Sequence, residues 1–139
     1  MTEPVFLDTA GWFAALSPRD QDHHPAARAY RALIDEAQRP CITTNLVVAE
    51  MHALLARRLG AATAVRFLDQ LHADATHEVV WATRDVERHA VDRWLRPFAD
   101  HAFSLTDAVS FEVMRQRGIR EALTFDNHFT VAGFTFVHA

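Results

Sequence analysis

The chain has 139 residues, half of them apolar, which is enough for one hydrophobic core and predicts a single domain over residues 1–139. Its net charge of -4 argues against binding nucleic acid by bulk electrostatics alone, and its single cysteine, Cys41, excludes an internal disulfide and a zinc site made of several cysteines. All 14 basic residues are arginines, so no lysine is present for a phosphate-binding loop or a Schiff base.

The predicted elements alternate between short apolar strands and longer amphipathic helices. In chain order, the pattern predicts a strand at 4–7, helices at 9–17 and 23–38, a strand at 41–43, helices at 45–59 and 61–73, a strand at 78–82, helices at 84–96 and 106–117, and strands at 121–125 and 134–137. Such alternation is typical of the α/β class, here with a central twisted parallel sheet of about five strands flanked by helices.

Gly60 separates two amphipathic segments and predicts a helical hairpin over 45–73. Two interpretations of this hairpin stay open, namely plain core packing and an arm or interface. The N-terminus MTEP lacks the positive charge and apolar run of a signal peptide, and no stretch approaches the roughly 18 apolar residues of a membrane span. We therefore expect a cytoplasmic protein that has no membrane partner.

Four acidic residues occupy positions where chemistry and local structure compete as explanations. Asp8 and Asp126 each follow a predicted strand, where an aspartate either forms a turn or faces the ligand crevice of an open α/β sheet. Asp107 stands three residues after Ser104, the spacing of a capping box. Glu50 lies four residues from Leu46 and from Leu54, which predicts that it points along an apolar stripe, with Arg57 as a candidate partner.

Caps and turns explain each of these acids alone, but they do not explain the set. All four would meet at the carboxyl edge of one sheet, where carboxylates repel one another unless a cation holds them. Oxygen ligands without cysteine suit Mg²⁺ or Mn²⁺, and such ions support attack of water on phosphodiesters. The histidines indicate no rival site, and His128 is expected in a loop beside Asp126.

Four segments resemble the PIN-domain ribonucleases, particularly the VapC-like toxins of type II toxin-antitoxin systems. They are FLDTAGWFAAL, TTNLVVAEMHALLARR, SLTDAVSFEVMRQRGI and EALTFDNHFTVAGF, in the order and spacing of that family. The first two are loose motifs and the last two together are specific.

The resemblance implies a PIN-like fold and a metal-dependent endoribonuclease. It implies that Asp8, Glu50, Asp107 and Asp126 form the catalytic and metal-binding set. Thr9, Asn45 and Thr106 match the polar positions that hold carboxylates and the attacking water in such domains. It further implies an RNA substrate, Mg²⁺ or Mn²⁺ as cofactor, a small cognate antitoxin and a homodimer.

Two other interpretations compete with this one. A phosphatase of the haloacid dehalogenase type also places an aspartate after its first strand, but it requires a second aspartate two residues later and a lysine, and both are missing here. The second alternative is a catalytically silent PIN-fold module that binds proteins through its helical hairpin. The presence of all four acids favours the enzyme over this module.

Overall fold

The computed structural model describes residues 2–137, which form one five-stranded sheet with helices on both faces. The strands are all parallel and lie in the order β3-β2-β1-β4-β5. Their bounds are β1 (Val5–Leu7), β2 (Cys41–Thr44), β3 (His77–Val80), β4 (Glu121–Leu123) and β5 (Thr135–Phe136). The predicted α/β class and the parallel sheet of five strands are therefore confirmed.

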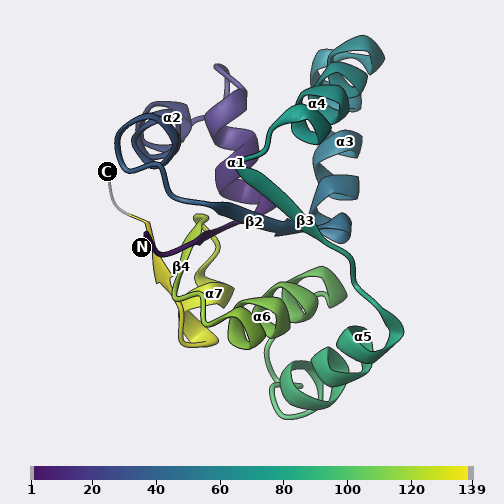
Figure 1. Cartoon of the computed structure of the whole chain (residues 1–139). Helices are drawn as coiled ribbons and strands as arrows, with labels where there is room; N and C mark the ends of the chain where they lie inside the picture. The colour runs from purple at the N-terminus through teal and green to yellow at the C-terminus, as the bar shows by residue number, and fades with distance from the viewer. Residues whose placement is uncertain (1, 138–139) are drawn as a thin grey trace.

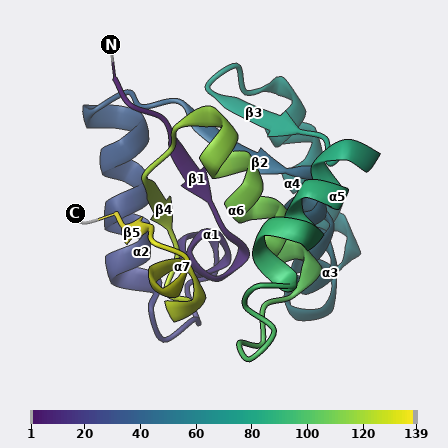
Figure 2. The ribbon, with the colours of Figure 1, turned by 90° about the horizontal axis from the view of Figure 1, so that it is seen from below.

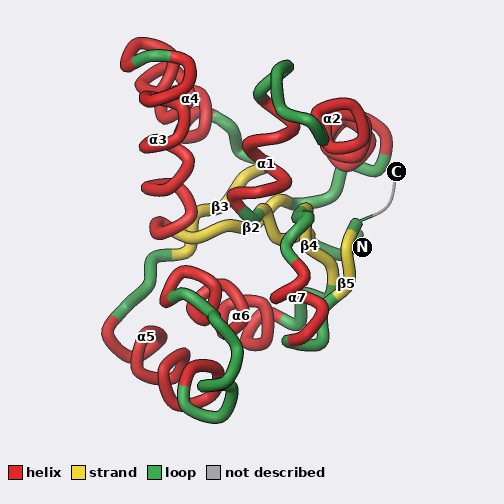
Figure 3. Tube along the Cα trace, turned by 180° about the vertical axis from the view of Figure 1, so that it is seen from behind, coloured by secondary structure: helices red, strands yellow, loops and turns green. Residues whose placement is uncertain are grey.

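Helices α1 to α4 cover one face of the sheet and α5 to α7 cover the other (Figures 1 and 3). Their bounds are α1 (Thr9–Leu16), α2 (His23–Arg31), α3 (Asn45–Leu59), α4 (Ala61–Ala73), α5 (Arg84–Ala90), α6 (Leu105–Arg117) and α7 (Asn127–Val131). Seen from below, α6 lies across the sheet between α5 and α7 (Figure 2). Within residues 2–137, no helix is both long enough and apolar enough to cross a membrane.

Two predicted helices are less regular than the sequence indicates. The predicted helix 23–38 is α2 followed by a π-helical turn, η1 (Ala32–Glu36), and the predicted helix 84–96 is α5 followed by a second such turn, η2 (Val91–Leu95). The sequence pattern also missed α7, whose five residues are too few to show a helical period.

The helical hairpin is present as α3 and α4, which pack together through a turn at Gly60. Gly60 has a φ of 100°, a conformation that favours glycine. Val47, Met51 and Leu55 form the buried stripe of α3. Part of the hairpin is thus core, while a role as an interface stays a prediction.

Candidate active site

The site lies where the connections of the sheet change direction. The chain passes from β1 to β2 on one side, whereas β4 pairs with β1 on the other side. Open α/β sheets bind ligands at the carboxyl ends of strands beside such a switch point. Asp8 follows β1 directly and Asp126 follows β4 by three residues, so both stand at this place.

Asp8 is buried, with 5% of its surface exposed, and it does not use its side chain to cap α1. Its Oδ2 atom accepts a hydrogen bond of 2.7 Å from Thr124 Oγ1. The same Thr124 oxygen accepts a bond of 3.0 Å from the backbone N–H of Asp126. Thr124 therefore joins the two acids across the switch point.

A glycine brings α1 close enough to β4 for this contact. A Cβ atom on Gly11 would lie 2.3 Å from the carbonyl oxygen of Leu123 and 2.7 Å from the backbone nitrogen of Thr124. No side chain fits there unless the backbone moves. The backbone N–H of Asp8 also donates to Leu123 O at 3.2 Å, which fixes the end of β1 against β4.

Asp107 caps a helix and also belongs to the acidic cluster, which consists of Asp107, Asp126 and His128. It forms the expected capping box, since Ser104 Oγ accepts from the Asp107 N–H and Asp107 Oδ2 accepts from the Ser104 N–H, both at 3.0 Å. The capping bond uses Oδ2, and Oδ1 has no hydrogen-bond partner within residues 2–137. A carboxylate so placed has a free oxygen for a cation.

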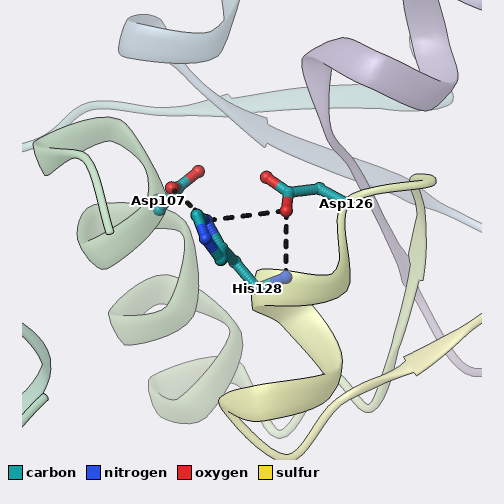
Figure 4. A group of neighbouring side chains, drawn as sticks. All are labelled: Asp107, Asp126 and His128. Carbon is teal, nitrogen blue, oxygen red and sulfur yellow. Dashed lines mark hydrogen bonds and ion pairs between the residues drawn. The ribbon is translucent and has the colours of Figure 1, made fainter. Parts of the chain in front are cut away.

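Asp126 and His128 complete the cluster on the other side (Figure 4). Asp126 Oδ1 caps α7 by accepting from the His128 N–H at 2.9 Å. The Nδ1 atom of His128 lies 3.3 Å from Asp107 Oδ2 and 3.5 Å from Asp126 Oδ1. Asp107, Asp126 and His128 thus offer ligand atoms that all lie within 4.8 Å of one another.

Glu50 differs from expectation, because its side chain is exposed and does not follow the buried stripe of α3. The buried stripe of Val47, Met51 and Leu55 is one residue, or about 100°, away from the line of Leu46, Glu50 and Leu54. The partner of Glu50 is not Arg57 but Thr9, whose Oγ1 donates to Glu50 Oε1 at 2.7 Å. Thr9 follows Asp8, so this bond ties Glu50 to the site.

Asn45 and Thr106 make other contacts than those expected from the resemblance. Asn45 Oδ1 accepts a bond of 2.7 Å from the backbone N–H of Ala82, beyond the end of β3. The carbonyl oxygen of Thr106 accepts from Ser110 Oγ at 2.8 Å. Within residues 2–137, neither side chain is hydrogen-bonded to one of the four acids.

The charge of the cluster is visible in the pKa of Asp8, which is raised from 3.8 to about 7. Burial is the largest cause, because it removes hydration from the carboxylate. The negative charges of Asp107 and Asp126 raise the pKa further, and the hydrogen bonds from Thr124 and Thr9 oppose the rise only in part. A divalent cation beside these acids would cancel the repulsion. Among residues 2–137, the ligand atoms that lie within 4.8 Å of one another belong to Asp107, Asp126 and His128, so these residues fit the metal that the resemblance implies, and Asp8 is linked to them by its charge.

Sequence reasoning missed three contributors: Gly11, Thr124 and His128. Thr124 fell inside the predicted strand 121–125, although β4 ends at Leu123. His128 was expected in a loop, although it is part of α7 and its ring reaches Asp107. The segment TFDNHF held the signal, since a hydroxyl and an imidazole both stand two residues from Asp126.

Comparison with known proteins gives a consistent picture. Residues 5–134 match the PIN domain family. The chain is 35% identical over 135 residues to the 23S rRNA-specific endonuclease VapC20 of two Mycobacterium tuberculosis strains, with 96% of this chain and 97% of the relative covered. It also superposes on the crystal structure of M. tuberculosis VapC20, described as a Sarcin-Ricin loop cleaving toxin, with a TM-score of 0.86 and 33% identity, covering 97% of this chain and 99% of that chain. The chain therefore belongs to the PIN-domain family.

Proposed function

We propose that this chain is a metal-dependent endoribonuclease and the toxin of a toxin-antitoxin pair. The observation that carries the proposal is Asp8, a buried carboxylate at the topological switch point whose pKa is raised to about 7 by burial and by neighbouring acids. Repulsion between neighbouring carboxylates destabilises the fold. Closely spaced carboxylates are nevertheless what a cation site requires. Membership of the PIN-domain family and similarity to VapC20 support the same activity.

Asp8, Asp107 and Asp126 would hold the cation, and Glu50 would orient it and the attacking water. A bound Mg²⁺ or Mn²⁺ would activate the water and stabilise negative charge at phosphorus. Thr124 aligns Asp8 with Asp126, and Thr9 holds Glu50 by its 2.7 Å bond. No side chain of this set has to act as a covalent nucleophile.

The proposed partners follow from the relatives. VapC20 is named for cleavage of 23S rRNA, and we propose ribosomal RNA as the first substrate to test here. A cognate antitoxin would cover the acids, most simply with an arginine whose guanidinium pairs with two carboxylate oxygens. We further propose a homodimer, which light scattering after size-exclusion chromatography would test, and activity in the cytoplasm, where that RNA is found.

The direct test is cleavage of a ribosomal RNA fragment by purified protein. We expect cleavage with Mg²⁺ or Mn²⁺, none in chelator, and loss of most activity in Asp8→Asn. Equal cleavage by wild type and Asp8→Asn would indicate a contaminating nuclease and would contradict the proposal. Absence of cleavage in every RNA tested, with the growth test below also negative, would favour the silent binding module.

A test in cells uses growth. Expression without a partner should arrest growth, because uncontrolled cleavage of an essential RNA stops translation, and Asp107→Asn should remove the arrest. The amide oxygen of asparagine preserves an acceptor for the Ser104 N–H, so the helix cap is largely kept. If Asp107→Asn arrests growth as strongly as wild type, toxicity arises elsewhere.

A further inference from the structure

Two exposed aromatic side chains follow strands whose carboxyl ends lie at the same edge of the sheet as Asp8. Of the 14 Phe, Tyr and Trp residues, all of which the structure describes, only Trp81 and Phe125 are exposed. Trp81 is 70% exposed, whereas Trp12 and Trp94 are 2% and 8% exposed. Phe125 is 40% exposed and directly precedes Asp126.

Both residues follow a strand at the catalytic edge of the sheet. Trp81 comes after β3 and Phe125 comes two residues after β4, and all strands are parallel, so their carboxyl ends face the same way. In the strand order, β2 and β1 stand between β3 and β4. The two aromatic residues therefore follow strands on either side of β1, the strand that Asp8 directly follows, and Phe125 lines a groove that also includes Arg28 of α2 and Phe136 of β5.

The segment that carries Trp81 is fixed to the start of α3 by a hydrogen bond. On one side of Trp81, Val80 pairs with Thr44 in the sheet. On the other side, the backbone N–H of Ala82 donates to Asn45 Oδ1 at 2.7 Å. Asn45 opens α3, the helix that presents Glu50. The contact of Asn45 that differed from expectation thus connects Trp81 to the helix of a proposed site residue.

The helix that begins three residues after Trp81, α5, carries exposed arginines, which favour a polyanion over an apolar protein face. A groove of about 610 Å³ along α5 and η2 is lined by Arg84, Arg88 and Arg96 together with Glu87, Val91 and Asp92, and Trp81 precedes it in the chain without lining it. Arg96 pairs with Asp92 at 3.0 Å. Within residues 2–137, Arg84 and Arg88 form no ion pair and are exposed, so both are available for phosphates.

We propose that Trp81 and Phe125 are base-stacking residues that hold unpaired nucleotides of the RNA on the two sides of the acidic cluster. Single-stranded and looped RNA is held by aromatic side chains against which splayed bases stack, with arginines on the backbone. The two aromatic residues select RNA whose bases around the scissile phosphate are unstacked. This inference rests on the proposed ribonuclease function and names how that site recognises its substrate.

Tryptophan fluorescence tests the stacking directly, because Trp81 is the exposed one of the three tryptophans. The protein is Asp107→Asn, which does not consume the RNA, and the probe is a 12-nucleotide single-stranded RNA with Mg²⁺. We expect the RNA to quench the exposed emission, and an abasic ribose-phosphate oligomer of equal length and charge not to do so. Trp81→Phe in the same background should bind nearly as well with the quenching lost, whereas Trp81→Ala should bind roughly tenfold more weakly.

Kinetics in the otherwise wild-type protein separate this inference from the proposed function. Trp81→Ala and Phe125→Ala should each raise KM for a looped RNA roughly tenfold with little change in kcat, since neither touches the cation site. Val65→Ala is the matched control, because Val65 is an exposed apolar residue on α4. If wild type cleaves no RNA, the proposed function fails.

If wild type cleaves RNA but KM and quenching are unaffected by Trp81→Ala and Trp81→Phe, the stacking role is refuted. Equal quenching by the abasic oligomer would also refute it. The stacking role is refuted as well if Trp81→Ala leaves RNA binding intact and instead splits a dimer in light scattering or releases a bound antitoxin, because Trp81 would then belong to a protein interface.

Discussion

Two buried carboxylates, Asp8 and Glu112, are 5% and 0% exposed and have opposite environments. The pKa of Asp8 is raised to about 7, because burial and two acids outweigh its hydrogen bonds. Burial also pushes the pKa of Glu112 upward, but hydrogen bonds from Arg115, Gln116 and Trp94 outweigh it and lower that pKa to about 2. Burial alone therefore does not identify a functional acid, whereas burial that the neighbouring donors do not offset marks a candidate.

The partners of Glu112 explain its structural role. It lies on α6, five residues after Asp107, and accepts bonds of 2.7 to 3.2 Å from Gln116, Arg115, Trp94 and Arg93. Two of these donors belong to η2, so Glu112 joins η2 to α6. Helix α6 thus presents Asp107 to the site and uses Glu112 to hold η2 in place.

The largest expected effect is loss of RNA cleavage in Asp8→Asn. We expect at least a hundredfold lower kcat, more than the roughly 10–100-fold that follows loss of an outer-shell contact. Glu112→Gln should cleave at nearly the wild-type rate where it is folded, as measured with labelled RNA at matched concentrations of folded protein. Comparable losses in both variants would erase the distinction between the two acids.

The pH dependence of stability should differ between the same two sites. The native pKa of Asp8 exceeds its ordinary value of 3.8, so between pH 3.8 and 7 the native state binds more protons and stability falls as pH rises. Without metal, this loss is complete above pH 7 and amounts to no more than about 4 kcal/mol. Urea unfolding in chelator should show Asp8→Asn more stable than wild type at pH 8 and similar near pH 4. If the free energies of unfolding of the two proteins differ by the same amount at every pH, the ionised Asp8 side chain does not destabilise the native state.

Gly11→Ala should damage the site through the backbone. A Cβ atom 2.3 Å from Leu123 O forces α1 away from β4, and overpacking of this kind costs about 1–3 kcal/mol. Cleavage should fall as well, because the bond between Thr124 and Asp8 depends on that approach. Ala10→Ser, at an exposed neighbouring position, is the control and should change neither melting nor cleavage. A Gly11→Ala protein with native melting and cleavage would show that the close contact is dispensable.

The smallest expected effects are losses of stability, first in Glu112→Gln and then in Glu78→Gln. Without its charge, the bonds from Arg93 and Arg115 weaken, at a cost of about 1–2 kcal/mol near neutral pH. The pKa of Glu112 is lowered, so this contribution is present above pH 4.5 and disappears as pH falls toward 2. Glu78→Gln, which removes the exposed pair with Arg117, should cost less. Equal losses in urea unfolding at pH 7 would contradict the special role of Glu112.

The sequence predicts the frame of this molecule better than the details of its site. Short apolar runs between longer helical segments predict the five strands. A parallel strand that is buried on both faces is apolar throughout, as in Val5 to Leu7. Contacts between distant segments have no such local signal. The bond from Thr124 to Asp8 spans 116 positions, and the approach of Gly11 to Leu123 depends on how α1 packs.

The error at Glu50 has a similar origin. A helix rotates by about 100° per residue, so the stripes through Leu46 and through Val47 are both plausible from the sequence, and packing against the sheet selects the second. Asp107 shows the converse. Its capping box is local and predictable, while its second role appears only when α7 brings His128 and Asp126 beside it.

The most direct test of the central claim is metal-dependent melting of wild type, Asp8→Asn and Glu112→Gln, each in chelator and in increasing Mg²⁺ or Mn²⁺. If Asp8, Asp107 and Asp126 share one cation site, wild type gains about 2.7 kcal/mol at a hundredfold excess of ion over Kd. Glu112→Gln should gain the same amount from a lower starting point, and Asp8→Asn should gain much less. Equal metal-induced gains in wild type and Asp8→Asn, or no gain in any protein at millimolar ion, would contradict the joint cation site.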